Sequence, residues 1–261
     1  MTWSIVAHDP ASGAFAVAVA TRAFAVGASC PFVRAGVGAV STQSMTNRYL
    51  GPAILDGLAR GLDPAAAIEG ALAGDAGSGM RQVHAVDRYG RTAAWTGQNC
   101  VEWCGSVAGD PPSAPAGSSP AGQIKGGGVS VAGNMLAGEA VVAATLTTFQ
   151  AGAPDGGTAI PLPERLMRAM LAGQAAGGDR RGRQSAAMRL ITTEDFPDLD
   201  LRVDDHPDPL AELERLLGLW REQSEPRLAA APRRSNPAGF TDLDAIEAGW
   251  RARGLDLRFR R

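Results

Sequence analysis

The chain has 261 residues, of which 45% are hydrophobic, 20% charged and 5% aromatic, with a formal net charge of −2 at pH 7. This composition excludes a wholly disordered chain, and the small negative charge excludes a basic field for nucleic acid or an anionic membrane. No apolar run reaches the roughly 18 residues of a membrane span, and the start has no basic segment followed by an apolar one. We therefore expect a cytoplasmic globular protein.

The first hundred residues predict antiparallel strands and two helices. Alternating apolar residues and turn chemistry predict a hairpin over residues 4–8 and 14–21, a third strand over 35–43, and a second hairpin over 81–86 and 91–96. Helical spacing covers residues 49–60 and 64–73, where Asp63 is the expected N-cap and Pro64 takes the first helical position.

The rest of the chain predicts further helices, two strands and a tail. Residues 105–128 are rich in Gly, Ser, Pro and Ala and predict a surface loop. Helices are expected over 138–149, 162–175 and 209–223, and strands over 184–192 and 199–204. Residues 226–237 are typical of a linker, and 241–253 predict a helix capped by Thr241. Because the strands lack regular βαβ spacing, the order favours an α+β fold with antiparallel sheets, a domain over 1–225 and an appendage over 226–261.

An arginine-rich block precedes the strand expected at 184–192. It contains Arg180, Arg181, Arg183 and Gln184 among glycines. The guanidinium group presents forked donors that match a carboxylate, and glycines let a backbone approach closely, so this block predicts a corner that binds an anion. The alternative is a turn whose arginines are solvated or paired with nearby carboxylates.

The cysteines and histidines have both chemical and structural interpretations. Three cysteines are too few for a disulfide scaffold: Cys30 is a nucleophile or a small buried thiol, and Cys100 with Cys104 is a redox pair, half of a metal site or two structural thiols. The Asp204-Asp205-His206 cluster is a cation site, an acid/base pair or a helix-start device, and His8 and His84 are scattered along strands. We favour the structural interpretations and expect no metal site and no cofactor.

Several blocks together resemble the bacterial family called domain of unknown function 1028. They begin with Ser4-Ile5-Val6-Ala7 at the N-terminus and end with the Gly-Gly-Asp-Arg-Arg-Gly and Asp-Asp-His-Pro blocks. Between these lie Gly36 to Val40, Asn47 with Tyr49 and Gly51, Arg81-Gln82-Val83, Thr96-Gly97 and Gly133-Asn134-Met135-Leu136. The resemblance implies a fold like that of the Ntn hydrolases, a four-layer αββα sandwich of two antiparallel sheets between helices. It implies no particular substrate.

Enzymes of that architecture use the side chain of their first residue as nucleophile and its α-amino group as base, since this amine titrates near pH 8. Thr2 fits this requirement once Met1 is removed. Thr21 and Arg22 stand where a proteasome-like pattern has an acidic residue, and Arg34 stands where that pattern has a lysine. Both are departures. Arg22 is expected to lower the pKa of a nearby nucleophile or to hold a substrate carboxylate, or else to pair with a surface acid.

Two neutral side chains, Gln43 and Asn47, flank the end of the third predicted strand. They are candidate donors to an oxyanion or caps of the following helix. We expect an Ntn-type amidohydrolase acting on a small carboxylate-bearing amide, with Thr2, Thr21 and Arg22 as catalytic residues. Substrate contacts are expected from Gln43, Asn47, Arg180, Arg181 and Gln184. The alternative is a non-catalytic or ligand-binding member that retains Met1. A homo-oligomer is expected by analogy.

Overall fold

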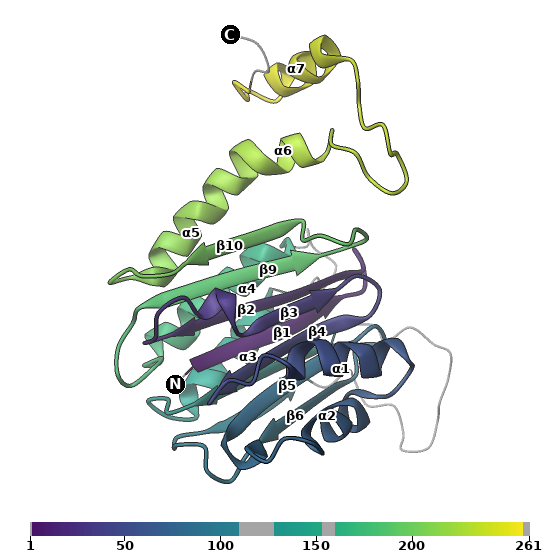
Figure 1. Ribbon diagram of the computed structural model, residues 1–261. Helices are drawn as coiled ribbons and strands as arrows, with labels where there is room; N and C mark the ends of the chain where they lie inside the picture. Colours follow the sequence, from purple (N-terminus) through teal and green to yellow (C-terminus); the bar gives the residue numbers. More distant parts are fainter. Residues whose placement is uncertain (1, 110–127, 153–159, 258–261) are drawn as a thin grey trace. The chain divides into compact units, whose positions relative to one another are not determined.

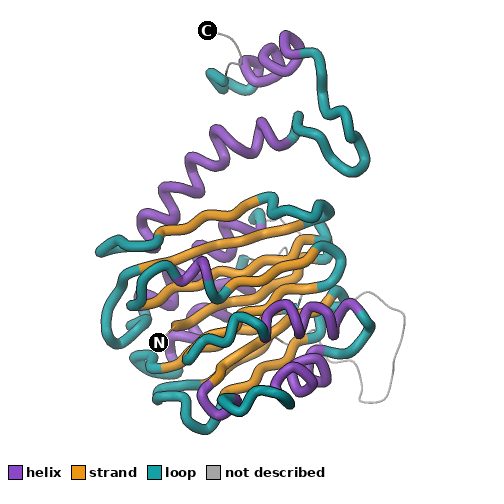
Figure 2. Tube along the Cα trace, in the orientation of Figure 1, coloured by secondary structure: helices purple, strands orange, loops and turns teal. Residues whose placement is uncertain are grey.

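The structure is a computed structural model that describes residues 2–109, 128–152 and 160–257. It is a mixed α/β protein with two antiparallel sheets (Figures 1 and 2). Contacts divide the chain into two units, Met1–Leu213 and Glu214–Arg261. Both sheets belong to the first unit.

The larger sheet places the first strand of the chain in its interior. Its order is β10 (Leu199–Val203), β9 (Ser185–Ile191), β2 (Ala14–Thr21), β1 (Thr2–Asp9), β8 (Val129–Asn134) and β7 (Gly105–Gly109). In the register of β1, Trp3 lies opposite Ala20 of β2, and Thr2 lies opposite Asn134 of β8. The predicted hairpin of β1 and β2 is confirmed.

The smaller sheet has the order β3 (Pro31–Arg34), β4 (Gly38–Ser44), β5 (Arg81–Asp87) and β6 (Thr92–Thr96). In the pairing of β4 with β5, Gln43 lies opposite Gln82, and Ser44 lies opposite Arg81. Both central strands therefore carry amide side chains near the same end of the sheet.

Two pairs of helices cover the outer faces of the sheets. Helices α1 (Leu50–Ala59) and α2 (Pro64–Leu72) pack on the smaller sheet, where Val40, Val83 and Ala85 face them. Helices α3 (Ala140–Ala151) and α4 (Leu162–Ala175) contact the larger sheet. A Cβ at Gly173 of α4 would lie 2.9 Å from the indole nitrogen of Trp3, so the lack of a side chain allows this close approach. Asp63 caps α2 as predicted, accepting a hydrogen bond from the N–H of Ala66.

The inner faces of the two sheets meet in a core that is part apolar and part polar. Because side chains alternate along a strand, Val6 of β1 and Val17 of β2 face inward and pack against Ala39 and Val86 of the smaller sheet. On the same inner face, β1 carries Ser4, which is fully buried. The polar part of this core lies toward the end of the sheets where β1 begins.

The second unit contains the end of α5 (Pro209–Leu219), a π-helical turn at Trp220–Ser224, α6 (Glu225–Leu228) and α7 (Leu243–Ala252). Within it, the indole N–H of Trp250 donates to the carbonyl oxygen of Pro226 at 3.2 Å. Helix α6 occupies the start of the segment expected to be a linker. The side chain of Asp242 caps α7, which corrects the prediction of Thr241 as the cap.

Three strands depart from the expectations. Strands β3 and β8 were not predicted, and β7 falls within the loop expected over residues 105–128. Residues 110–127 of that loop lie outside the described residues. The missed strands are short and contain Gly, Ala or Pro, which have low β-propensity, and they are held by pairing with neighbouring strands. No helix in the described ranges is long and apolar enough to cross a membrane.

Candidate functional site

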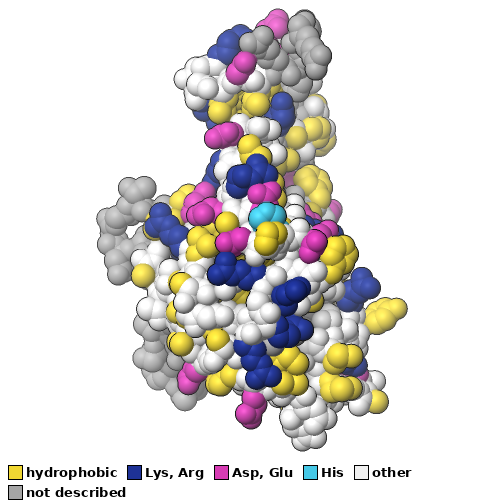
Figure 3. Space-filling view, turned by 90° about the vertical axis from the view of Figure 1, so that its left-hand side faces the viewer, with side chains coloured by type: hydrophobic (Ala, Val, Ile, Leu, Met, Phe, Trp, Pro, Cys, Tyr) yellow, Lys and Arg dark blue, Asp and Glu magenta, His cyan; other side chains and the backbone are white. Residues whose placement is uncertain are grey.

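Several strands of the two stacked sheets begin or end side by side. We call this row of strand ends, which is distinct from the edge strands of either sheet, the Thr2 edge. At this edge β1 begins with Thr2, β2 ends with Thr21 and β8 ends with Asn134. In the smaller sheet β4 ends there with Ser44 and β5 begins with Arg81. The edge lies on the left of Figure 1, and Figure 3 shows it face on.

The structure brings Thr2 and Thr21 together. Their hydroxyl oxygens are 3.2 Å apart, and both residues are buried. The next inward-facing residue of β1, Ser4, contacts the smaller sheet. By the alternation of the strand, the side chain of Thr2 points in the same direction, toward the space between the ends of the sheets.

Behind Thr2 a buried polar layer joins the two sheets. The Ser4 hydroxyl donates to Gln43 Oε1 at 2.8 Å and lies 2.7 Å from His84 Nε2. His84 Nδ1 lies 3.1 Å from the hydroxyl of Ser130 on β8. Burial without a charged partner lowers the pKa of His84 to about 3, so its imidazole is neutral at pH 7. This layer aligns β1 against the smaller sheet two residues from Thr2.

Gln82 is the most highly connected side chain of this layer. Its Oε1 accepts from Gln43 Nε2 at 2.8 Å and from Asn134 Nδ2 at 2.9 Å. Its Nε2 donates to Thr96 Oγ1 at 2.9 Å and to the carbonyl oxygen of Gly133 at 2.8 Å. Gln43 is fully buried in this network, which gives it a structural role in joining the sheets.

The arginine block forms a corner next to Thr21. Asp179 is buried, and its carboxylate accepts from the backbone N–H of Arg22 at 2.7 Å and from the Arg181 guanidinium at 3.2 Å. The exposed guanidinium of Arg22 donates to Gln184 Oε1 at 2.8 Å, and Gln184 Nε2 donates to Asp205 Oδ1 at 3.1 Å. We call residues 179–184 with Arg22 the arginine corner.

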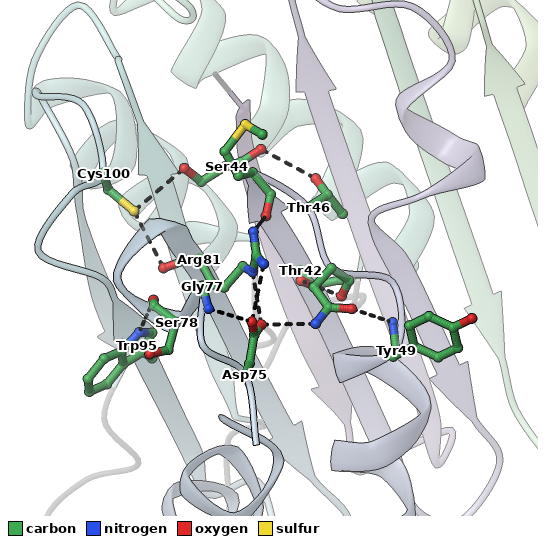
Figure 4. Close-up of polar contacts among 12 residues, drawn as sticks. Thr42, Ser44, Thr46, Tyr49, Asp75, Gly77, Ser78, Arg81, Trp95 and Cys100 are labelled. Atoms are coloured by element: carbon green, nitrogen blue, oxygen red, sulfur yellow. Dashed lines mark hydrogen bonds and ion pairs between the residues drawn. The ribbon is translucent and has the colours of Figure 1, made fainter. Parts of the chain in front are cut away.

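A nearly buried ion pair braces the smaller sheet at the same edge (Figure 4). The Asp75 carboxylate accepts from Arg81 Nε at 2.9 Å, from Asn47 Nδ2 at 2.9 Å and from the backbone N–H of Gly77 at 2.9 Å. These donors hold the pKa of Asp75 well below its ordinary value. Asn47 Oδ1 accepts from the N–H of Tyr49, so the two ends of this amide hold the loop together.

We expect Asp75→Asn to destabilise the protein by about 2 kcal/mol, because it leaves the guanidinium of Arg81 without its charged partner. The side chains of Arg81 and Asp75 are only 17% and 9% exposed, which limits the compensation that water provides. Denaturant unfolding at pH 7 measures the loss. Asp56→Asn is the matched control, since Asp56 pairs with Arg34 on the surface and its loss should be much smaller. Equal losses would contradict this account.

Strained backbone also gathers at the ends of these strands. Ser44 has φ 71° and Met135 has φ 53°, left-handed values that residues other than glycine seldom adopt. Ser44 ends β4, and Met135 directly follows β8. Such strain persists where the surroundings enforce it and is enriched at binding and catalytic sites.

The remaining candidates take structural positions. Burial raises the pKa of the Cys30 thiol to about 11, so it is not a thiolate at pH 7. Cys100 and Cys104 are free thiols, and Cys100 donates to the carbonyl oxygen of Arg81. His206 Nδ1 accepts from the N–H of Asp208 just before α5, as expected of a helix-start device. Among the described residues, no group of three or more His, Cys, Asp or Glu side chains is arranged to hold a metal ion.

Sequence reasoning missed Asn134, Asp179, Asp75 and the roles of Gln82 and His84. Asp179 lies in the arginine block, and its negative charge next to three arginines was a signal that it would pair with them. Asn134 ends a strand that was not predicted. Asp75 is separated from Arg81 by a short turn, and local sequence gave no sign that it would be buried.

Comparison with known proteins decides the family. A profile described as a family of unknown function (DUF1028) matches residues 2–213. The chain belongs to the DUF1028 family. No curated protein matches it.

Among solved structures, the chain is similar to protein SPO2555 from Silicibacter pomeroyi, a DUF1028 protein. The two are 29% identical with a TM-score of 0.77, and the match covers 92% of this chain and 96% of the other. The DUF1028 match spans the Thr2 edge, the arginine corner and the Asp75 ion pair, and ends where the second unit begins.

Proposed function

We propose that this protein is an Ntn-type amidohydrolase with Thr2 as its nucleophile. The observation that carries the proposal is the position of Thr2. Thr2 is the first residue of an interior strand, at the end where the strands of two facing sheets meet, and its hydroxyl is 3.2 Å from that of Thr21. The covering of the two sheets by α1 with α2 and by α3 with α4 supports a four-layer αββα sandwich of the Ntn-hydrolase kind.

In the proposed reaction, removal of Met1 leaves the α-amino group of Thr2 free. This amine takes the proton of the Thr2 hydroxyl, whose oxygen attacks the amide carbonyl carbon. The resulting intermediate breaks its C–N bond, the proton passes to the leaving amine, and an ester to Thr2 remains. Water then cleaves the ester and releases a carboxylic acid. Met1 lies outside the described residues.

The arginine corner supports a substrate that carries a carboxylate. Arg22 follows Thr21 directly, and Gln184 orients its exposed guanidinium. A second cation, Arg180, is exposed nearby on the same corner. A fork of donors so placed matches a carboxylate and fixes the orientation of the amide that bears it. We therefore propose a small carboxylate-bearing amide as substrate. As separate parts of the proposal, the protein is cytoplasmic and forms a homo-oligomer.

A non-catalytic ligand-binding protein that retains Met1 is the second candidate. It is favoured by the burial of the Thr2 side chain, which is 6% exposed. It is also favoured by the departures from the proteasome pattern at Arg22 and Arg34, since neither position supplies the acid or the lysine of that pattern.

We expect Thr2→Ala to lower amide hydrolysis at least about 1,000-fold, because it removes the attacking oxygen while still allowing Met1 to be trimmed. Release of primary amine from a panel of carboxylate-bearing amides measures the activity, and intact mass establishes the state of the N-terminus. Thr2→Ser should retain activity. Thr92→Ala, at the opposite end of the smaller sheet, is the matched control. Full activity in protein that retains Met1 would exclude the mechanism.

A further inference from the structure

Exposed apolar side chains gather at the Thr2 edge where the strands of the smaller sheet end. Met45, Met80 and Val101 are 62%, 41% and 43% exposed. Met45 follows β4, Met80 precedes β5, and the backbone N–H of Met45 donates to the carbonyl oxygen of Met80 at 3.1 Å. We call these three side chains the apolar lip.

Backbone hydrogen bonds join Val101 to the rest of the edge. The N–H of Asn99 donates to the carbonyl oxygen of Gly79 at 2.7 Å, which ties the loop of Val101 to the turn before Met80. The N–H of Met135 donates to the carbonyl oxygen of Val101 at 2.8 Å. Met135 directly follows the strand that pairs with the start of β1. The apolar lip is therefore anchored to β5, through the turn before Met80, and to β8, through Met135.

The facing of the sheets places the lip at the same end as Thr2. Ser4 of β1 contacts Gln43 of β4, and farther along β1 Val6 packs in one cluster with Ala39, so the two strands run in opposite directions. Two residues back from Ser4 is Thr2, and two residues on from Gln43 is Met45. The start of β1 at Thr2 and the segment that follows β4 therefore lie at the same end of the two sheets.

Cationic side chains lie at the same edge beside the larger sheet, where the backbone N–H of Arg180 donates to the carbonyl oxygen of Met135 at 3.4 Å. Arg22 is exposed, and within the described part of the chain Arg180 makes no side-chain hydrogen bond or ion pair. Figure 3 shows arginine side chains in a band on this face with hydrophobic side chains beside them. An apolar surface and a charged one thus both lie at the edge where Thr2 begins β1.

We propose that the substrate is an amphiphilic amide, with an apolar chain on one flank of the amide and a carboxylate on the other. The inference rests on the proposed function and adds the apolar flank to it. An alkyl chain that covers Met45, Met80 and Val101 removes apolar surface from water on both partners, while the guanidinium of Arg22 pairs with the carboxylate. A ligand with only the alkyl chain or only the carboxylate would leave one of the two surfaces uncovered.

Binding to the Thr2→Ala protein tests the inference without relying on turnover. The probes are N-acylglycines with acyl chains of about two, six and ten carbons, the matching uncharged N-acylglycinamides, and N-alkylsuccinamates, which reverse the amide. Calorimetry should show at least ten-fold tighter binding of the longest than of the shortest charged probe, since each added methylene that leaves water strengthens binding. Removal of the carboxylate should weaken binding at least five-fold.

Substitutions assign the two flanks separately. Met80→Ser should reduce the gain with chain length, and Arg22→Gln should abolish the preference for the carboxylate. Tyr89→Ser and Arg88→Gln are the matched controls, because both residues are exposed in the turn between β5 and β6, away from the Thr2 edge. Neither control should change binding.

The outcomes separate the two proposals. If binding to the Thr2→Ala protein depends on chain length and on the carboxylate but the parent protein releases no amine, the hydrolase proposal is excluded and the proposed ligand class is supported. Hydrolysis of short amides with no gain from either group keeps the hydrolase and overturns the amphiphilic substrate. A dimer in light scattering that Met80→Ser dissociates would also overturn it, since a second copy would then cover the lip.

Discussion

On acidification from pH 6.5 toward pH 4.5 we expect the free energy of unfolding to fall, and we expect His84→Gln to remove much of that fall. His84 is fully buried between the sheets, and its two ring nitrogens contact the hydroxyl groups of Ser4 and Ser130. Protonation would place a charge there without a counter-ion. The folded protein therefore resists binding the proton that the unfolded chain accepts readily.

The sign follows from the pKa values. Folding lowers the pKa of His84 from 6.5 to about 3, so between these values the unfolded state binds more protons than the folded state. Stability then rises with pH in this window and is lost as pH falls. The full window corresponds to an upper limit of about 4 to 5 kcal/mol. Below about pH 4 the loss of the Asp75 ion pair adds a further decrease.

Urea unfolding at several pH values between 7.5 and 4.5 measures this slope in the parent and in His84→Gln. Glutamine can still accept from one serine and donate to the other, so the variant removes the titration and keeps a neutral polar group. His206→Gln is the control, because that histidine lies near the surface at the start of α5. Burial also lowers the pKa of His8, which leaves a smaller slope of the same sign. An unchanged slope in His84→Gln would refute this explanation.

Replacement of Gln82 by leucine should produce the largest loss of stability at neutral pH, about 3 kcal/mol or more. Leucine has a similar size and no polar atoms, so Asn134 loses its acceptor, Gln43 loses one of two acceptors and the carbonyl oxygen of Gly133 loses a donor. Each polar group left buried without a partner costs about 1–3 kcal/mol. The loss is large because these groups come from both sheets.

Chemical unfolding of Gln82→Leu and of Gln98→Leu at pH 7.5 tests this expectation. Gln98 is exposed in the loop after β6, so the same substitution there should change stability little. We also expect Gln82→Leu to weaken any activity of Thr2, because the network of Gln82 holds Asn134 opposite Thr2. Equal stabilities of the two variants would show that the polar layer contributes nothing.

The elements that were predicted well have local signals. The first hairpin alternates apolar residues around a turn at residues 9–13, and α2 begins with Asp63 and Pro64. Strand β8 has no such signal, because it is short, contains glycine and follows a Gly-rich segment. It becomes a strand by pairing with β1 and β7, two segments that are distant in sequence. Contacts of this kind override propensity.

The candidate site divides along the same line. Thr2, Thr21, Arg22 and the arginine block could be selected from the chain because their side chains are reactive or charged and stand at strand ends. The sequence by itself determined the alternation and capping that make these strands and helices, since both depend on neighbours a few residues apart. Only the tertiary structure decided that Asp179 holds Arg22, that Gln82 links both sheets and that His84 is buried without charge. These properties depend on which distant segments exclude water together, and no local pattern records that.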